Sequence, residues 1–494
     1  MAARAKAAAQ DAPAGEASIP CRGERSYPVA RKDTALVIID MQSDFLTSEG
    51  RVGMHYKGDL KTRRAIPGVE RLLAACRACG MTVAHSRSHR YGSTVRSELV
   101  GKGDEGYEFY PSCKPLPGEI VVDKWTFGAF ASTPLEDELR ARGVERILLC
   151  GVLTNVCVFA TASQAVDRFF RVCLVEDACA ALNDEWHTCA VELINGPQTR
   201  KGHNAQLGLY FGEVATVADA EQALAPLAKL HDAEPVAEGP QKKPKVWPKV
   251  EVPAFASAAR QQAVVAWAKA AACGPAPGDG AVPCRGGRSF PVAPKDTALV
   301  IIDMQTDFLT PTGRVGMHYK GTPIQSGLAG VERLLAACRR AGFTVAHSRS
   351  HRYGATVRDE LVGAGDEGYE FYPSCKPLPG EIVVDKWTFG AFASTPLEDE
   401  LRARGVERIL LCGVLTNVCV FATAVQAVDR FMRVCLVHDA CGAFSTEWHD
   451  TAIRLLEEPQ TKGGHNTQVG LYFGEVASVG DVEDALAPMA PAGP

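Results

Sequence analysis

The sequence lacks any apolar run of the ~18 residues that a membrane-spanning helix requires. Its apolar stretches, such as Ala35–Ile39, have the length of buried strands instead. It also lacks a strong charge of either sign: the formal net charge is −5, and no Lys/Arg cluster is interleaved with aromatic residues on a helical pattern. We therefore expect neither a membrane nor a nucleic acid as a partner.

The first 20 residues lack the apolar segment of a secretory signal peptide. Arg4 and Lys6 in an Ala-rich setting leave an organellar transit segment as the weaker alternative, and Asp11 and Glu16 count against it. The chain has 17 cysteines but no export signal, which favours reduced, mostly buried thiols and a cytoplasmic location. One cysteine in each half needs a different explanation.

The chain repeats itself at an offset of 263 residues that becomes 262 from Gly68 and Gly330 onward. Gly118–Ala131 and Gly380–Ala393 are identical in sequence, GEIVVDKWTFGAFA. A period this long indicates duplicated domains and excludes a solenoid, whose repeats are shorter. We predict a disordered or leader segment over 1–20, a first domain over 21–230, a Pro/Lys-rich linker with a short helix over 231–283, and a second domain over 284–488.

Within each half, apolar segments of strand length alternate with segments of helical period. The strands predicted in the first half are Ala35–Asp40, Thr82–Ser86, Glu119–Asp123, Arg146–Val152, Arg171–Asp177 and Glu213–Val217. The predicted helices are Gly68–Cys79, Leu135–Arg142, Asn155–Arg168 and Glu185–Ile194. Continuous apolar strands that alternate with helices imply a mostly parallel sheet covered on both faces. The expected fold is a Rossmann-type three-layer α/β/α sandwich, present twice.

Three reactive side chains fall where predicted strands end. Asp40 ends the first strand, Lys124 follows the third, and Cys157 begins the helix after the fourth. Ligands of open parallel sheets bind at the carboxyl ends of the strands, so we expect the three side chains to meet there. Each residue alone has a plainer interpretation: Asp40 could cap a loop, Lys124 could be a surface amine, and Cys157 could be a buried core thiol. The second half repeats the set as Asp303, Lys386 and Cys419.

Cysteine chemistry depends on the thiolate, which a helix N-terminus and a nearby ammonium favour. In our interpretation Cys157 is the nucleophile, Asp40 accepts its proton, and Lys124 orients Asp40. Backbone N–H groups of Leu153 and Cys157 are the predicted oxyanion hole, matched by Leu415 and Cys419 in the second half. His187 and His449 offer a Cys–His pair as an alternative, but we expect helix capping or core roles for them.

The three regions around these residues, ALVIIDMQSDF, VVDKWTFGAF and LLCGVLTNVCV, resemble the signature regions of the isochorismatase-like cysteine hydrolases. The resemblance covers roughly 32–219 and 295–481. It implies an Asp-Lys-Cys triad, a thioester acyl-enzyme, and cis peptide bonds at Val152–Leu153 and Val414–Leu415.

Nicotinamidases of this family hold a metal with an Asp and nearby His residues, and here Arg87 stands where that Asp would fall. His85 and His89 remain, but two histidines without a carboxylate make a weak metal site. Phosphate loops, H-E-x-x-H and the serine elbow are absent from the sequence. We therefore expect no metal and no cofactor.

The segments SRSHR, PGEIVVDK and GAFASTPLE resemble the ureide-hydrolysing branch of the family. The guanidinium groups of Arg87 and Arg90 would bind a substrate carbonyl or carboxylate, and a surface salt bridge is the alternative role for them. Aromatic residues would form an apolar wall, with core packing as the alternative. The predicted substrate-binding residues are Phe45, Arg87, Arg90, Trp125 and Phe130 in the first half, and Phe308, Arg349, Arg352, Trp387 and Phe392 in the second.

The leading hypothesis is an amidohydrolase that cleaves a small ureide, carbamoyl compound or carboxamide in both halves. The alternatives are isochorismatase or nicotinamidase activity, or a non-catalytic duplicated scaffold. The halves differ after the fifth strand, at Glu176/His438, Ala180/Gly442, Leu182/Phe444 and Asn183/Ser445, which suggests different substrate preferences. We expect the halves to form an intramolecular pseudo-dimer, with further homo-oligomerisation open.

Overall fold

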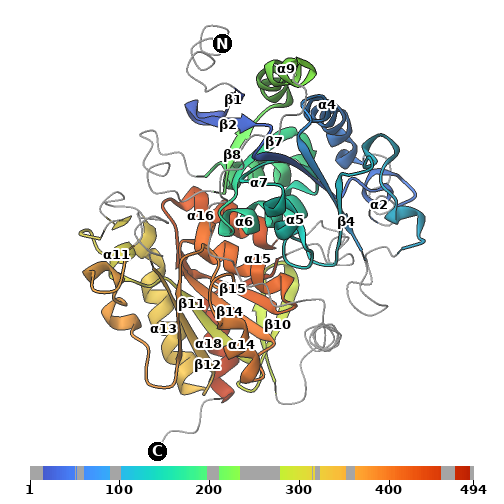
Figure 1. Cartoon of the computed structure of the whole chain (residues 1–494). Coiled ribbons are helices and arrows are strands. Elements are labelled where there is room, and N and C mark those ends of the chain that lie inside the picture. The colour runs from blue at the N-terminus through green and yellow to red at the C-terminus, as the bar shows by residue number, and fades with distance from the viewer. Residues whose placement is uncertain are drawn as a thin grey trace, which may run out of the picture. The chain divides into compact units, whose positions relative to one another are not determined.

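The computed structural model describes residues 15–50, 52, 60–89, 102–196, 211–233, 279–313, 315–316, 323–351, 362–457 and 473–489. The chain divides into two compact units that correspond to its two halves (Figure 1). Each unit holds one six-stranded sheet in which every strand is parallel to its neighbours. The predicted duplication and the predicted parallel sheets are confirmed.

The first sheet has the strand order β5-β4-β3-β6-β7-β8. Its strands are β3 (Thr34–Ile39), β4 (Thr82–Ser88), β5 (Ile120–Lys124), β6 (Arg146–Val152), β7 (Arg171–Ala180) and β8 (Glu213–Ala215). The central strand β3 is buried along its whole length, as its apolar sequence TALVII requires. Successive strands are added to one side of β3 as far as β5 and to its other side from β6 onward, so the strand order reverses between β3 and β6, which makes this point a natural site for ligands.

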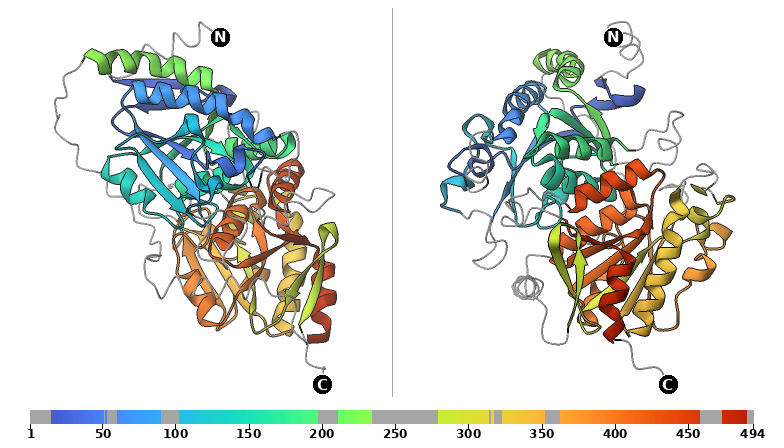
Figure 2. Two further views of the ribbon diagram at one scale, coloured as in Figure 1. Left: turned by 90° about the vertical axis from the view of Figure 1, so that its right-hand side faces the viewer. Right: turned by 180° about the vertical axis from the view of Figure 1, so that it is seen from behind.

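Helices cover both faces of this sheet. They are α2 (Ser43–Leu46), α4 (Ala65–Ala78), α5 (Leu135–Ala141), α6 (Phe159–Asp167), α7 (Asp184–Asn195) and α9 (Val217–Ala233). Helices α4 and α9 pack together on one face, and α5, α6 and α7 lie on the other (Figures 1 and 2). The predicted three-layer sandwich is therefore present.

The second half repeats this architecture with the order β13-β12-β11-β14-β15-β16. Its strands are β11 (Thr297–Ile302), β12 (Thr344–Ser350), β13 (Ile382–Lys386), β14 (Arg408–Val414), β15 (Arg433–Gly442) and β16 (Glu475–Ala477). Its helices are α11 (Thr306–Leu309), α13 (Leu328–Arg340), α14 (Leu397–Ala403), α15 (Phe421–Asp429), α16 (Thr446–Glu457) and α18 (Val479–Leu486).

Each half also begins with an antiparallel hairpin that the sequence analysis missed. In the first half, β1 (Glu16–Pro20) pairs with β2 (Ser26–Ala30), so the fold includes residues that we assigned to the leader. In the second half, β9 (Gly280–Cys284) pairs with β10 (Arg288–Val292) and begins inside the predicted linker. The predicted linker helix lies outside the described residues.

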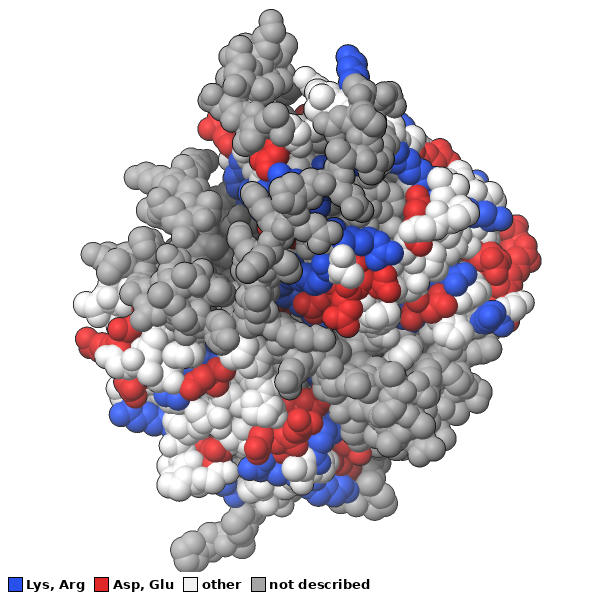
Figure 3. All heavy atoms as spheres, in the orientation of Figure 1, with Lys and Arg blue, Asp and Glu red and all other residues white. Residues whose placement is uncertain are grey.

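Charged side chains of both signs lie beside one another on the described surface in Figure 3. Among the described residues, no helix combines the length and the apolar character needed to cross a membrane.

Candidate active site

Asp40 stands directly after β3 with a φ of 53°, a backbone conformation that few non-glycine residues adopt. Its carboxylate is fully buried and accepts hydrogen bonds from two hydroxyls of the neighbouring strand β4. Ser86 Oγ donates to Oδ1 over 2.9 Å, and Ser88 Oγ donates to Oδ2 over 2.7 Å. Strain at a buried carboxylate is typical of functional sites, because the surrounding contacts must enforce it.

Lys124 ends β5 and reaches the same carboxylate. Its Nζ lies 2.8 Å from Asp40 Oδ2, and neither side chain is exposed. The ammonium also donates to Ser88 Oγ over 3.0 Å and to the carbonyl of Thr126 over 3.1 Å. The buried charge is therefore paired and hydrogen-bonded, as the low-polarity interior requires.

Cys157 lies on a π-helical turn, Thr154–Val158, between β6 and α6. Gly151 permits the turn, because its φ is 116° and a Cβ there would lie 2.1 Å from the carbonyl oxygen of Ile39. The Val152–Leu153 peptide bond is cis, as the family resemblance implies. Thr161 Oγ1 donates to the carbonyl of Cys157 over 2.7 Å.

The Cys157 thiol contacts both Asp40 and Lys124, so all three predicted side chains meet. Burial raises the pKa of Cys157 to about 12, although the Lys124 charge acts to lower it. The ammonium therefore acts in the direction that we expected, but burial outweighs its effect. A thiol with a raised pKa can act as a nucleophile only with the help of a base, and the Asp40 carboxylate is in contact with it.

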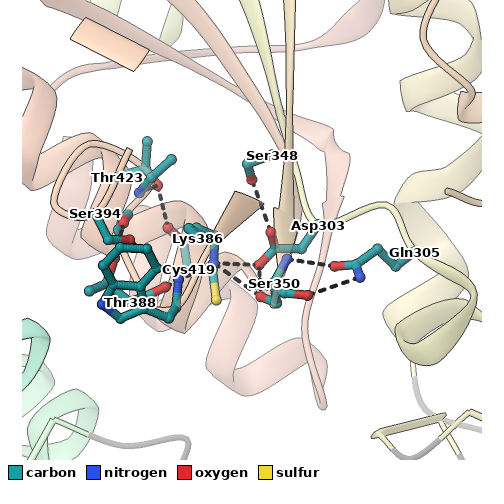
Figure 4. A network of polar contacts seen from close by, with 12 residues as sticks. Asp303, Gln305, Ser348, Ser350, Lys386, Thr388, Ser394, Cys419 and Thr423 are labelled. Carbon is teal, nitrogen blue, oxygen red and sulfur yellow. Dashed lines mark hydrogen bonds and ion pairs between the residues drawn. The ribbon is translucent and has the colours of Figure 1, made fainter. Parts of the chain in front are cut away.

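The second half builds the same site (Figure 4). Lys386 Nζ lies 2.7 Å from Asp303 Oδ2, and Ser348 and Ser350 donate to Asp303 as Ser86 and Ser88 do to Asp40. The Val414–Leu415 bond is cis. Burial raises the pKa of Cys419 to about 12 as well.

The two serines and a glutamine were missed in the sequence analysis. Gln42 Oε1 accepts from the Ser88 amide over 2.7 Å, and its Nε2 donates to the carbonyls of Ser88 and Tyr107. A signal was available, because Ser86 and Ser88 alternate along β4 and so share one face of the sheet.

The same alternation directs Arg87 to the other face, away from Asp40. Its guanidinium pairs with Asp123 over 2.8 Å, and its Cζ lies 4.1 Å from the centre of the Tyr107 ring. The structure does not bring the predicted substrate ligand Arg87 to the cysteine, and the salt-bridge alternative describes its contacts. Arg349 pairs with Asp385 in the same way. Arg90 and Arg352 lie outside the described residues.

The aromatic residues predicted to bind substrate differ in exposure. Phe45 and Phe130 are buried in the core, and Phe130 stacks on Phe170 at the far end of α6, with ring centres 5.6 Å apart. Trp125, next to Lys124, keeps partial exposure. The second half places the corresponding residues in the same surroundings: Phe308 and Phe392 are buried and Trp387 is partly exposed.

His85 Nε2 lies 2.9 Å from Glu119 Oε2, and the His89 ring packs edge-on against Tyr107 with ring centres 5.4 Å apart. Within the described ranges, no group of three or more His, Cys, Asp or Glu side chains could hold a metal ion. The C-x-x-C sequence Cys76–Cys79 lies at the end of α4, where both thiols are buried and burial raises their pKa.

Comparisons with known proteins match domain-length parts of the chain. The Isochorismatase domain family matches residues 34–219 and 297–467. The ureidoacrylate amidohydrolase RutB of Variovorax paradoxus is 29% identical over 238 residues, which are 42% of this chain and 87% of that protein. RutB of Azorhizobium caulinodans is 26% identical over 239 residues, 43% of this chain and 100% of that protein. A solved cysteine hydrolase from Pseudomonas syringae is 26% identical with a TM-score of 0.34, covering 40% of this chain and 96% of that chain.

Proposed function

This chain belongs to the isochorismatase family of hydrolases, whose domain it carries twice, and we propose that each half is a cysteine-dependent amidohydrolase. The substrate is a small ureide, carbamoyl compound or carboxamide, and one C–N bond is cleaved. The observation that carries this proposal is the buried contact of Asp40, Lys124 and Cys157, repeated by Asp303, Lys386 and Cys419.

The first step follows from the hydrogen bonds of Asp40. A carboxylate can accept about four hydrogen bonds, and Ser86, Ser88 and Lys124 provide three. The remaining position is available to the proton of the Cys157 thiol. As Sγ attacks the substrate carbonyl carbon, the proton moves to Asp40, and Lys124 stabilises the negative charge that forms nearby.

The attack places a negative charge on the carbonyl oxygen. The first N–H groups of a helical turn have no acceptor within the helix, so the amides near Leu153 and Cys157 can donate to this oxyanion. Asp40 then returns the proton to the leaving nitrogen, the C–N bond breaks, and a thioester to Cys157 remains. Water attacks the thioester with Asp40 as base, releasing the acid and restoring the thiol.

The substrate class is supported by the relatives, two of which are ureidoacrylate amidohydrolases at 29% and 26% identity. A ureide presents a carbonyl flanked by nitrogen, which suits a thiol nucleophile beside an oxyanion hole. We do not assign the carboxylate-binding role to Arg87 and Arg349, which pair with Asp123 and Asp385.

The test is ammonia release from biuret, triuret, ureidoacrylate, N-carbamoyl amino acids and nicotinamide. The full chain is compared with Cys157→Ala, Cys419→Ala and the double variant. Activity that survives each single change and disappears in the double variant would support two cysteine sites. Wild-type activity in the double variant, or no turnover of any compound, would contradict the proposal and favour the scaffold hypothesis.

A trapped intermediate provides a second criterion. Mass spectrometry of a rapidly quenched reaction should find the acyl group on the peptide that contains Cys157 or Cys419. Cys150 and Cys412, buried in β6 and β14, serve as internal controls that stay unmodified.

We also propose a cytoplasmic location. All cysteines among the described residues are free thiols, as a reducing compartment maintains them. Fluorescent fusion of the full chain, followed by fractionation, tests this location against an organellar one.

A further inference from the structure

A histidine on the helix after β7 contacts the turn that carries the cysteine. His187, on the first turn of α7, has its Nδ1 2.9 Å from Thr154 Oγ1. Thr154 is the first residue of the Thr154–Val158 turn. The N-cap of α7 is Asn183, so the capping role that we expected for His187 is wrong, and His187 lies partly buried beside the turn.

The link is kept in the second half although its surroundings have changed. His449 Nδ1 lies 2.9 Å from Thr416 Oγ1. The helix caps differ, since Asn183 Oδ1 accepts from the Trp186 amide and Ser445 Oγ accepts from the Trp448 amide. Two different caps thus hold the histidine at the same distance from the turn.

The position of Thr154 controls the rest of the turn. Its carbonyl accepts the amide of Phe159, and the carbonyl of Leu153 accepts the amides of Val156 and Val158. These bonds make the turn one hydrogen-bonded unit that includes Cys157. A hydroxyl fixed at its first residue therefore fixes the direction in which the thiol and the neighbouring amides point.

We infer that His187 and His449 are positioning residues, which hold the cysteine turn in its reactive orientation through Thr154 and Thr416. The inference rests on the proposed function, in which Cys157 and Cys419 are the nucleophiles. A misplacement of about 1 Å at a reacting group can cost ~100-fold in rate, so loss of the link should act mainly on kcat.

The experiment isolates the first site in the full chain that carries Cys419→Ala. In that background, His187→Leu removes the hydrogen bond, and His187→Asn keeps a polar atom near the position of Nδ1. We expect His187→Leu to lower kcat roughly 10- to 100-fold with little change in KM, and His187→Asn to restore most of it. Equal kcat in the parent and His187→Leu, or no rescue by asparagine, would overturn the inference.

Thr154→Val and Thr154→Ser provide the matched pair on the other side of the link. Valine keeps the shape of threonine and removes the hydroxyl, so it tests the link even where His187→Leu does not fold. We expect Thr154→Val to lower kcat as much as His187→Leu does, and Thr154→Ser to retain activity. The double variant Thr154→Val/His187→Leu should have a kcat no lower than that of either single variant. Additive losses would overturn the inference, because the two side chains would then act separately.

A second readout does not depend on turnover. Alkylation of Cys157 by iodoacetamide, followed by peptide mass spectrometry, reports the orientation and access of the thiol. We expect a several-fold change in rate in His187→Leu that His187→Asn reverses. If no panel compound is hydrolysed, the proposed function fails while this rate still decides the inference, and an unchanged rate would refute it.

Discussion

The buried ion pair between Asp40 and Lys124 allows a prediction of stability as well as activity. Both side chains are fully buried, with 2.8 Å between Nζ and Oδ2. Lys124→Met removes the cation and leaves the carboxylate with neutral hydrogen-bond donors such as Ser86 and Ser88. Breaking a buried pair in this way typically costs about 3–5 kcal/mol, because a buried charge loses its partner.

The double variant Asp40→Asn/Lys124→Met should recover much of this loss. It removes both charges together, and an amide can still hydrogen-bond to Ser86 and Ser88. Replacing both members of a buried pair is often close to neutral, so we expect at least ~2 kcal/mol of recovery relative to the sum of the single changes.

The assay must separate the two halves, since a two-domain chain does not unfold in one step. Hydrogen exchange followed by peptide mass spectrometry gives opening free energies for each half. Lys386→Met is the matched control, because it should destabilise the second half and leave the first unchanged. A loss below ~1 kcal/mol for Lys124→Met, or strictly additive losses, would show that the pair is not buried and coupled as described.

Three further predictions concern the same site and its support. Ser88→Ala removes a hydrogen bond to a charged group, worth about 1.5–3 kcal/mol, so kcat of the first half should fall roughly 10- to 150-fold in a steady-state assay. Because burial raises the pKa of Cys157 to about 12, its alkylation rate should rise steadily from pH 6 to about 10, and a plateau near neutral pH would contradict this. Burial acts to raise the pKa of Glu119, but hydrogen bonds from Arg77, the Leu116 amide and His85 bring it down to about 2. The stability that this lowered pKa provides is present above the unfolded-state pKa of ~4.3 and is lost as the pH falls towards 2. Wild type and Glu119→Gln should therefore differ in melting temperature at pH 6 and converge near pH 2.

Much of the fold could be predicted, because local sequence patterns determine it. The apolar run around β3 and the helical period of α4 depend only on neighbouring residues. The hairpin β1–β2 was missed because its pairing is decided by burial against the rest of the domain: Ile19 and Tyr27 are buried there. Strand β7 extends three residues beyond its predicted end, to Ala180, because it pairs with β6 again after a shift in register.

The duplication, the α/β class and the placement of Asp40, Lys124 and Cys157 at the carboxyl ends of strands could all be predicted from the amino-acid sequence. The order of strands and helices along the chain is sufficient for these conclusions. It also implied, through the family resemblance, the cis bonds that the structure contains.

The set of side chains that surrounds the cysteine depends on how distant strands pair and pack. Pairing of Ile39 with Ser86 brings Asp40 to two serines that lie 46 and 48 residues away in sequence, and it turns Arg87 to the opposite face. Burial, which is a property of the whole fold, raises the pKa of Cys157 against the effect of Lys124. Alternation along β4 separates the two serines from Arg87, but strand register and packing across the domain decide that the serine face meets Asp40.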